Sequence, residues 1–150
     1  MFEKINYNLF TLFNIGTLPA SGTFASLFTV IFYFILTFFF SNFFFYILIF
    51  SVLIYSIFFL NKILIKFKNK DPKEIVIDEF IGQLIPLLAC QQNLYLIVAS
   101  FLSFRFFDIT KIFPASYFDQ KIKGSIGIIG DDIVAGLYSL IIIIIIKQYL

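Results

Sequence analysis

Long apolar stretches separated by short polar ones dominate the pattern of this chain. Residues 5–61 contain no Asp, Glu, Lys or Arg, and the polar pair Ser41-Asn42 divides their apolar second part. A helix needs about 20 apolar residues, at about 1.5 Å each, to cross the hydrocarbon core of a bilayer. The pattern therefore predicts a hairpin of two membrane helices, over residues 24–40 and 43–60.

The second half of the chain predicts three further helices. Residues 80–104 are also uncharged, but Pro86 and the polar triplet at 91–93 interrupt them, so two shorter helices are expected there. The three expected helices cover residues 76–89, 94–112 and 131–147, with a connecting loop at 114–130 before the last. The first of the three is too short for a straight span, so we expect it to be re-entrant, tilted or buried against its neighbours.

Composition strengthens this interpretation. Apolar residues make up 61% of the chain, against about 45–50% in soluble domains, and mean hydropathy is +0.99. We therefore expect an all-α integral membrane bundle of about five to six helices, some too short to span fully. It would form a single membrane-embedded domain over residues 1–150. The net charge of +2 does not indicate a nucleic-acid partner, and the sequence identifies no protein partner.

Charge concentrates between the predicted hairpins and indicates an orientation. Residues 61–74 contain five lysines, and lysine-rich loops beside a span usually face the cytoplasm. With two spans before this loop and a returning hairpin after it, four polar stretches meet at the same membrane face. They are residues 16–26, 78–79, 105–111 and 124–132. This convergence requires an even number of spans in each hairpin.

Two pairs of adjacent acids stand at the edges of apolar segments, Asp78-Glu79 and Asp131-Asp132. A carboxylate in hydrocarbon costs about 2.5–3.5 kcal/mol even on the mildest scale, and neighbouring carboxylates repel each other. A divalent cation between the pairs offsets both costs, and Mg²⁺ prefers oxygen ligands. The alternative is helix capping, with Asp131 as an N-cap, but capping explains only one acid of each pair.

A third polar group lies on one helix face. Arg105, Asp108 and Lys111 follow one another at three-residue spacing, so they form either an ion-pair ladder or a positive site for a phosphate. The chain has no histidine, which excludes histidine nucleophiles and Ser-His-Asp triads. Its single cysteine, Cys90, lacks the basic neighbours that activate a thiolate. Carboxylates with Mg²⁺ therefore remain as the chemical equipment, and they suit reactions at a phosphoryl group.

Small residues flank the charged ones. The loop before the first membrane helix contains Gly22 and Thr23, and backbone N–H groups at a helix start suit a phosphate. It is not a P-loop, because the Gly-Lys-Ser/Thr core is missing. Gly124, Gly127 and Gly130 precede the second acid pair. They allow the backbone to approach a ligand closely, or they form a flexible connector.

Four stretches resemble the phosphatidylglycerophosphatase A family, in the family's order and approximate spacing. They are residues 16–27, 75–82, 104–111 and 127–136. The strings Asp-Glu-Phe-Ile-Gly and Asp-Asp-Ile-Val-Ala-Gly are the most specific. The resemblance implies an all-α, multi-pass, Mg²⁺-dependent phosphatase of the bacterial inner membrane. Such hydrolases act in phospholipid biosynthesis and convert the membrane phospholipid phosphatidylglycerophosphate to phosphatidylglycerol and inorganic phosphate.

Together the residues and the resemblance define a candidate site that faces the cytoplasm. The candidate catalytic residues are Asp78, Glu79, Asp108, Asp131 and Asp132, and all of these except Asp108 are the candidate Mg²⁺ ligands. The candidate substrate-binding residues are Gly22, Thr23, Arg105 and Lys111. Whether water attacks directly or a carboxylate forms a phosphoenzyme stays open, as does a base or ligand role for Asp108.

The sequence departs from the family pattern at several positions beside these residues. Ser21 and Ala25 replace a proline and a glycine of the first motif, and Gly130 replaces a larger apolar residue. Lys123-Gly124-Ser125 stands where relatives often carry His-Gly-Gly. The altered first motif leaves open a scaffold with impaired catalysis. Acids in membrane segments can also line an ion path, so a component of a membrane cation transporter stays open as well.

Overall fold

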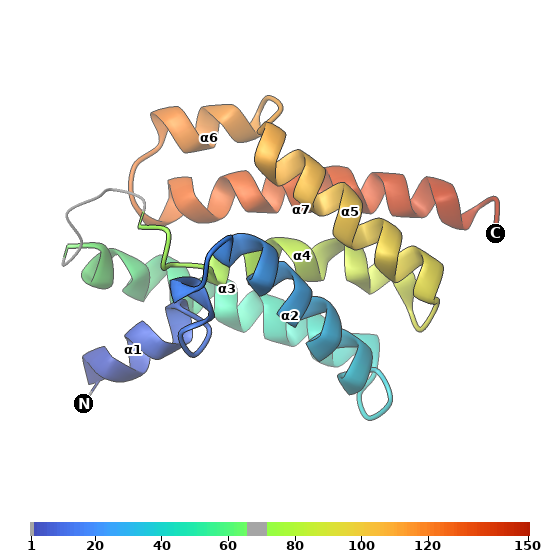
Figure 1. The fold of residues 1–150 in the computed structure, drawn as a ribbon, viewed down its shortest axis with the longest axis horizontal. Coiled ribbons are helices and arrows are strands. Elements are labelled where there is room, and N and C mark those ends of the chain that lie inside the picture. Colours follow the sequence, from blue (N-terminus) through green and yellow to red (C-terminus); the bar gives the residue numbers. More distant parts are fainter. Residues whose placement is uncertain (1, 66–71) are drawn as a thin grey trace.

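The computed structural model describes residues 2–65 and 72–150, and these residues fold into helices without a β-strand (Figure 1). The α-helices are α1 (Phe2–Phe10), α2 (Ser21–Leu36), α3 (Asn42–Leu64), α4 (Ile77–Cys90), α5 (Leu94–Thr110), α6 (Ala115–Lys121) and α7 (Ser125–Lys147), with a short 3₁₀ turn at Ile15–Thr17. The all-α prediction is confirmed. Much of the lysine-rich loop, residues 66–71, lies outside the described residues.

Two helices were not predicted, and one begins earlier than expected. Helix α1 lies in the polar N-terminal segment, and α6 lies in the stretch expected to be a connecting loop. Helix α7 begins at Ser125 rather than near Asp131, although glycine disfavours helix. A Cβ at Gly127 would meet the carbonyl of Ile122, and one at Gly130 would meet the ring of Phe118. These glycines therefore let α6 pack on α7, and that packing outweighs their poor helix propensity.

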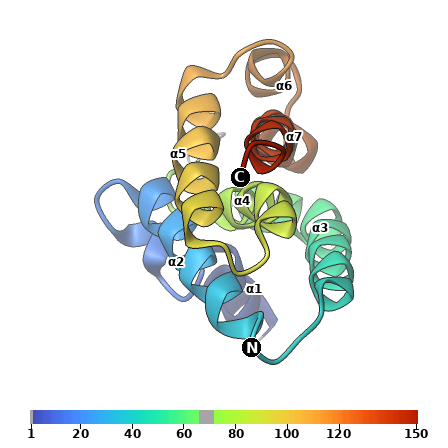
Figure 2. The same cartoon turned by 90° about the vertical axis from the view of Figure 1, so that its right-hand side faces the viewer.

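Helix α4 is the centre of the fold. Viewed along the bundle, α2, α3, α5 and α7 surround it (Figure 2). Most of its side chains are buried, including Ile81, Leu84 and Leu87, which are fully inaccessible. The short helix predicted over residues 76–89 is therefore buried against its neighbours, one of the three arrangements expected for it.

A close crossing between α4 and α7 sets the relative position of the acid pairs. A Cβ on Gly82 would lie 2.7 Å from the carbonyl oxygen of Asp132, and one on Gly136 would meet the carbonyl of Gly82. Small residues allow two helix backbones to approach in this way. The two helices run in the same direction (Figure 1). Asp78 lies one turn before Gly82 and Asp132 one turn before Gly136, so the crossing places both acids at the same level.

Two helices are long and apolar enough to cross a membrane. Helices α3 and α7 each have 23 residues, with mean hydropathies of 2.6 and 2.2 over their most apolar windows. Large apolar side chains project outward along α3, where Phe50 is 65% exposed and Phe58 is 68% exposed. An extended apolar surface of this kind is typical of contact with lipid or with another protein. Helix α2 is apolar but shorter.

Candidate active site

The beginnings of α2, α4 and α7, the end of α5 and the end of α3 surround a cavity of about 750 Å³. Six acids and three lysines contribute to its lining: Asp78, Glu79, Asp108, Asp119, Asp131, Asp132, Lys73, Lys111 and Lys123. All four polar stretches that the sequence analysis expected to converge reach this cavity, the first of them through Ser21. Six of the nine candidate site residues line this cavity: Asp78, Glu79, Asp108, Lys111, Asp131 and Asp132.

Three carboxylates form a tight group at the inner end of the cavity. Oxygen atoms of Asp78, Glu79 and Asp132 all lie within 4.8 Å of one another. Asp78 is only 9% exposed and Asp132 only 3%. One buried oxygen of Asp78 and one of Glu79 have no hydrogen-bond partner among the described residues. Because buried carboxylates this close repel each other strongly, the group fits a hard divalent cation with oxygen ligands, such as Mg²⁺.

Local structure explains why two of these acids are tolerated at the start of α4. Asp78 and Glu79 occupy the first turn of the helix, where the positive end of the helix dipole favours negative charge. Asp132 gains no such stabilisation from a helix start, because it lies nearly two turns inside α7. The placement of Asp132 therefore depends on the contact with α4 rather than on its own helix.

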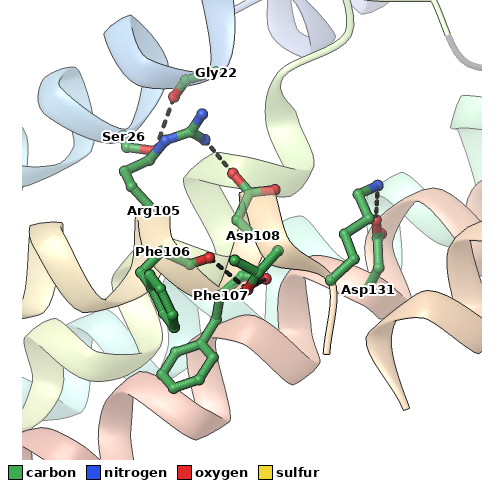
Figure 3. A network of polar contacts seen from close by, with 9 residues as sticks. Gly22, Ser26, Arg105, Phe106, Phe107, Asp108 and Asp131 are labelled. Carbon is green, nitrogen blue, oxygen red and sulfur yellow. Dashed lines mark hydrogen bonds and ion pairs between the residues drawn. The ribbon is translucent and has the colours of Figure 1, made fainter. Parts of the chain in front are cut away.

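Asp131 lies beside this group and is bound to a lysine. Lys111 donates a hydrogen bond from Nζ to Asp131 Oδ2 at 2.6 Å (Figure 3). It donates a second one to Asp119 Oδ1 at 2.5 Å. Thus three of the four predicted Mg²⁺ ligands gather, while Asp131 forms an ion pair. The alternative of Asp131 as an N-cap is wrong, because α7 begins at Ser125.

The environment of Lys111 keeps its ammonium charged. Lys111 is the C-cap of α5, where it adopts a left-handed backbone conformation with φ of 45°. Burial alone lowers the pKa of Lys111, but the hydrogen bonds to Asp119 and Asp131 raise it above its ordinary value. The side chain is still 31% exposed, so a bound anion can reach the ammonium group.

Arg105 and Glu79 converge on Gly22. Arg105 forms an ion pair with Asp108, one turn further along α5 (Figure 3). A Cβ on Gly22 would lie 3.0 Å from Arg105 Nη1 and would also collide with Glu79 Oε1. The glycine at this position therefore makes room for two charged side chains. Because Lys111 pairs with Asp119 and Asp131, the three-membered ladder considered for this face does not form.

Part of the first motif lies away from the cavity. Thr23 is exposed, and its N–H donates to the carbonyl of Ala20 at 2.9 Å. The N–H groups of Gly16 and Thr17 likewise donate within the loop. Neither Gly22, Thr23 nor Arg105 lines the cavity described above. The structure thus brings the acids and Lys111 together in the cavity, whereas these three candidate substrate-binding residues lie outside its lining.

Several polar residues of the cavity were not among the candidate site residues chosen from the sequence. Asp119 accepts a hydrogen bond from Lys111, and Asn61 lines the cavity from α3. Lys73 and Lys123 also line the cavity and are exposed, so they lie at the cavity mouth. Asn61 has one available signal, because it is a polar residue at the end of an apolar run. Asp119 has none, since the helix that carries it was expected to be a loop.

The fold and the cavity define a class: an α-helical protein with membrane-type apolar helices and a carboxylate site suited to phosphate chemistry. A family model described as phosphatidylglycerophosphatase A matches residues 8–147. The chain therefore belongs to the phosphatidylglycerophosphatase A family and is an enzyme of that family. The resemblance seen in its motifs is confirmed.

Two individual relatives match most of the chain, and a third matches a shorter part of it. A phosphatidylglycerophosphatase A of Haemophilus influenzae is 35% identical over 133 residues, covering 88% of this chain and 82% of the relative. A putative phosphatidylinositol-3-phosphatase of Bacteroides thetaiotaomicron is 33% identical, covering 89% and 84%. A phosphatidylglycerophosphatase A of Escherichia coli is 44% identical over 70 residues, covering 46% and 41%. No solved structure matches this chain.

Proposed function

We propose that this protein is a Mg²⁺-dependent phosphatidylglycerophosphatase, which hydrolyses phosphatidylglycerophosphate to phosphatidylglycerol and inorganic phosphate. The observation that carries the proposal is the group formed by Asp78, Glu79 and Asp132, next to the Lys111 ion pairs in the same cavity. Membership of the family supports a lipid phosphate as the substrate. The protein acts as a single membrane-embedded domain.

The reaction replaces one phosphorus–oxygen bond with another. The oxygen of water bonds to the terminal phosphorus, the bond from phosphorus to the glycerol oxygen breaks, and that oxygen takes a proton. Asp78, Glu79 and Asp132 would hold Mg²⁺, which when bound polarises a phosphoryl oxygen. Lys111 binds the phosphate by its charge, and Asp131 and Asp119 orient the lysine side chain. Asp108 orients Arg105, whose positive charge lies beside Glu79.

The same proposal places the enzyme in the bacterial inner membrane with its cavity facing the cytoplasm. Support comes from the apolar helices α3 and α7 and from the five lysines in residues 61–74, since basic loops favour the cytoplasmic side. The end of α3 and the beginning of α7 line the cavity. It therefore lies at the level of lipid headgroups rather than in the middle of the bilayer.

Phosphate release from the lipid in detergent micelles tests the activity. We expect the purified protein to release phosphate. EDTA should abolish this release, and added Mg²⁺ should restore it. Asp132→Asn should lower kcat/KM by at least about 100-fold, because it removes one of three clustered oxygen donors. Glu74→Gln is the matched control, since Glu74 does not line the cavity.

Two outcomes would contradict the proposal. Activity that persists in EDTA after dialysis would exclude the metal requirement. Metal-dependent cation flux in vesicles without any phosphate release would favour a transporter component instead. The Bacteroides relative carries the name of a phosphatase for a different headgroup, so phosphatidylinositol 3-phosphate belongs in the same substrate panel.

A further inference from the structure

Two lysines that line the cavity have no acidic partner among the residues that the structure describes. Lys73 and Lys123 both line the cavity, and neither forms an ion pair with any residue in the described ranges 2–65 and 72–150. Lys111 differs, because two carboxylates hold it. An ammonium group without a carboxylate partner at the wall of a cavity is available to bind an anion.

The backbone at both lysines is anchored to other parts of the fold. Ser21 Oγ donates a hydrogen bond of 2.8 Å to the carbonyl of Lys73, which ties this residue to the start of α2. Asn61 Oδ1 accepts a hydrogen bond of 2.8 Å from the N–H of Ser125, two residues after Lys123. Ser125 Oγ donates to the carbonyl of Ile57 at 3.1 Å. The backbone that carries each lysine is therefore fixed by hydrogen bonds to another helix, unlike the backbone of a loose surface loop.

Gly124 allows this anchoring next to Lys123. Its φ of 78° is in the left-handed region, which side chains with a Cβ rarely adopt. A Cβ here would also lie 2.6 Å from Asn61 Oδ1. The turn that carries Lys123 is therefore built to close against α3.

The cavity has an acidic inner end and a basic outer end. Asp132 lies seven residues after Ser125 on α7, which corresponds to about 10 Å along the helix axis. Lys123 and Lys73 precede α7 and α4, so they lie at the outer end. Lys73 and Lys123 are exposed, whereas Asp78 and Asp132 are buried, so an anion at the lysines and a phosphate at the carboxylates would occupy different parts of the cavity.

We propose that Lys73 and Lys123 form a second anion subsite that binds the internal phosphodiester of the lipid substrate and selects headgroups with two phosphates. The inference rests on the proposed function. The phosphodiester is joined to the terminal phosphate through one glycerol, so both groups belong to the same headgroup. A cavity of about 750 Å³ is large enough for such a headgroup.

Comparing two lipids separates this subsite from the inner one. Phosphatidylglycerophosphate carries a phosphodiester and a terminal phosphate, whereas phosphatidic acid carries only a phosphate monoester. In neutral detergent, the double variant Lys73→Gln/Lys123→Gln should lower kcat/KM for phosphatidylglycerophosphate about tenfold or more, mainly through KM. Hydrolysis of phosphatidic acid should stay within about twofold. Replacing both lysines with arginine should preserve the preference.

Lys121→Gln is the matched control, because Lys121 is close in sequence and does not line the cavity. Product inhibition gives a second measurement if phosphatidic acid reacts too slowly. Phosphatidylglycerol keeps only the phosphodiester, so its inhibition constant should rise about tenfold in the double variant.

Each contrary outcome has a distinct meaning. An equal loss on both lipids that varies with the content of anionic lipid in the micelles would assign the lysines to the bilayer surface and overturn the subsite. An unchanged substrate ratio with an unchanged inhibition constant would also overturn it. If the wild-type protein hydrolyses neither lipid, the proposed function itself fails.

Discussion

Adding one methyl group at the α4–α7 crossing tests whether this contact positions the carboxylates. In Gly82→Ala, the new Cβ would lie 2.7 Å from the carbonyl oxygen of Asp132 and 2.7 Å from the ring of Phe104, whereas ordinary contact begins at 3.4 Å. The carbonyl belongs to the backbone and cannot rotate away. The two helices must therefore separate by about 0.7 Å, and Asp78 moves away from Asp132.

The size of the effect follows from this displacement. Overpacking a close contact costs about 1–3 kcal/mol of folding free energy, and a misplacement of about 1 Å at a reacting site costs about 100-fold in rate. We expect Gly82→Ala to lower kcat/KM by about 10- to 100-fold and to raise the Mg²⁺ concentration needed for half-maximal activity. Phosphate release measured across a Mg²⁺ titration reports both changes.

The control is Val98→Ile, which also adds one carbon to a helix but at a side chain that is 50% exposed. It should leave activity and unfolding temperature unchanged. A Gly82→Ala protein with full activity at the wild-type Mg²⁺ requirement would refute the reasoning, because the carboxylates would then not depend on this crossing.

Three further measurements address other contacts of the site. Asn61→Ala should lower the free energy of unfolding by about 1 kcal/mol, since the Asn61 side chain on α3 caps the first N–H of α7. Asn42→Ala, at the other end of α3, should leave the free energy of unfolding unchanged. Asp119→Asn should reduce kcat/KM less than Lys111→Gln, because the lysine keeps its bond to Asp131; equal losses would contradict a supporting role. Mg²⁺ should raise the unfolding temperature of the wild-type protein but not of Asp78→Asn, and an equal rise in both would remove Asp78 from the metal group.

Much of the candidate site was predictable because charge is rare in this chain. The acid pairs Asp78-Glu79 and Asp131-Asp132 were selected for their place beside apolar segments. Asp108 and Lys111 were selected for their three-residue spacing on one helix face, and all six residues line the same cavity. The cost of burying a charge makes such residues conspicuous. Their division of labour was not predictable, since only coordinates separate Asp131 with its lysine from the three clustered carboxylates.

Other features had no local signal. Helix α6 and its Asp119 lie in a segment whose glycines predict a loop, and packing between α6 and α7 decides the outcome. Thr23 illustrates the reverse case, because a motif position favoured it while the fold leaves its side chain exposed. A short segment cannot encode which neighbour will cover it.

By itself, the sequence determined the helical class, the apolar surface and the identity of the acids, because hydropathy and charge act residue by residue. The tertiary structure alone decided which acids meet, through the Gly82–Gly136 crossing, and which lysines line the cavity without an ion pair in the described part of the chain. The physical reason is distance along the chain. Asp78 and Asp132 belong to separate helices. Their carboxylates come together only because the two backbones approach closely at Gly82 and Gly136, which have no Cβ atom.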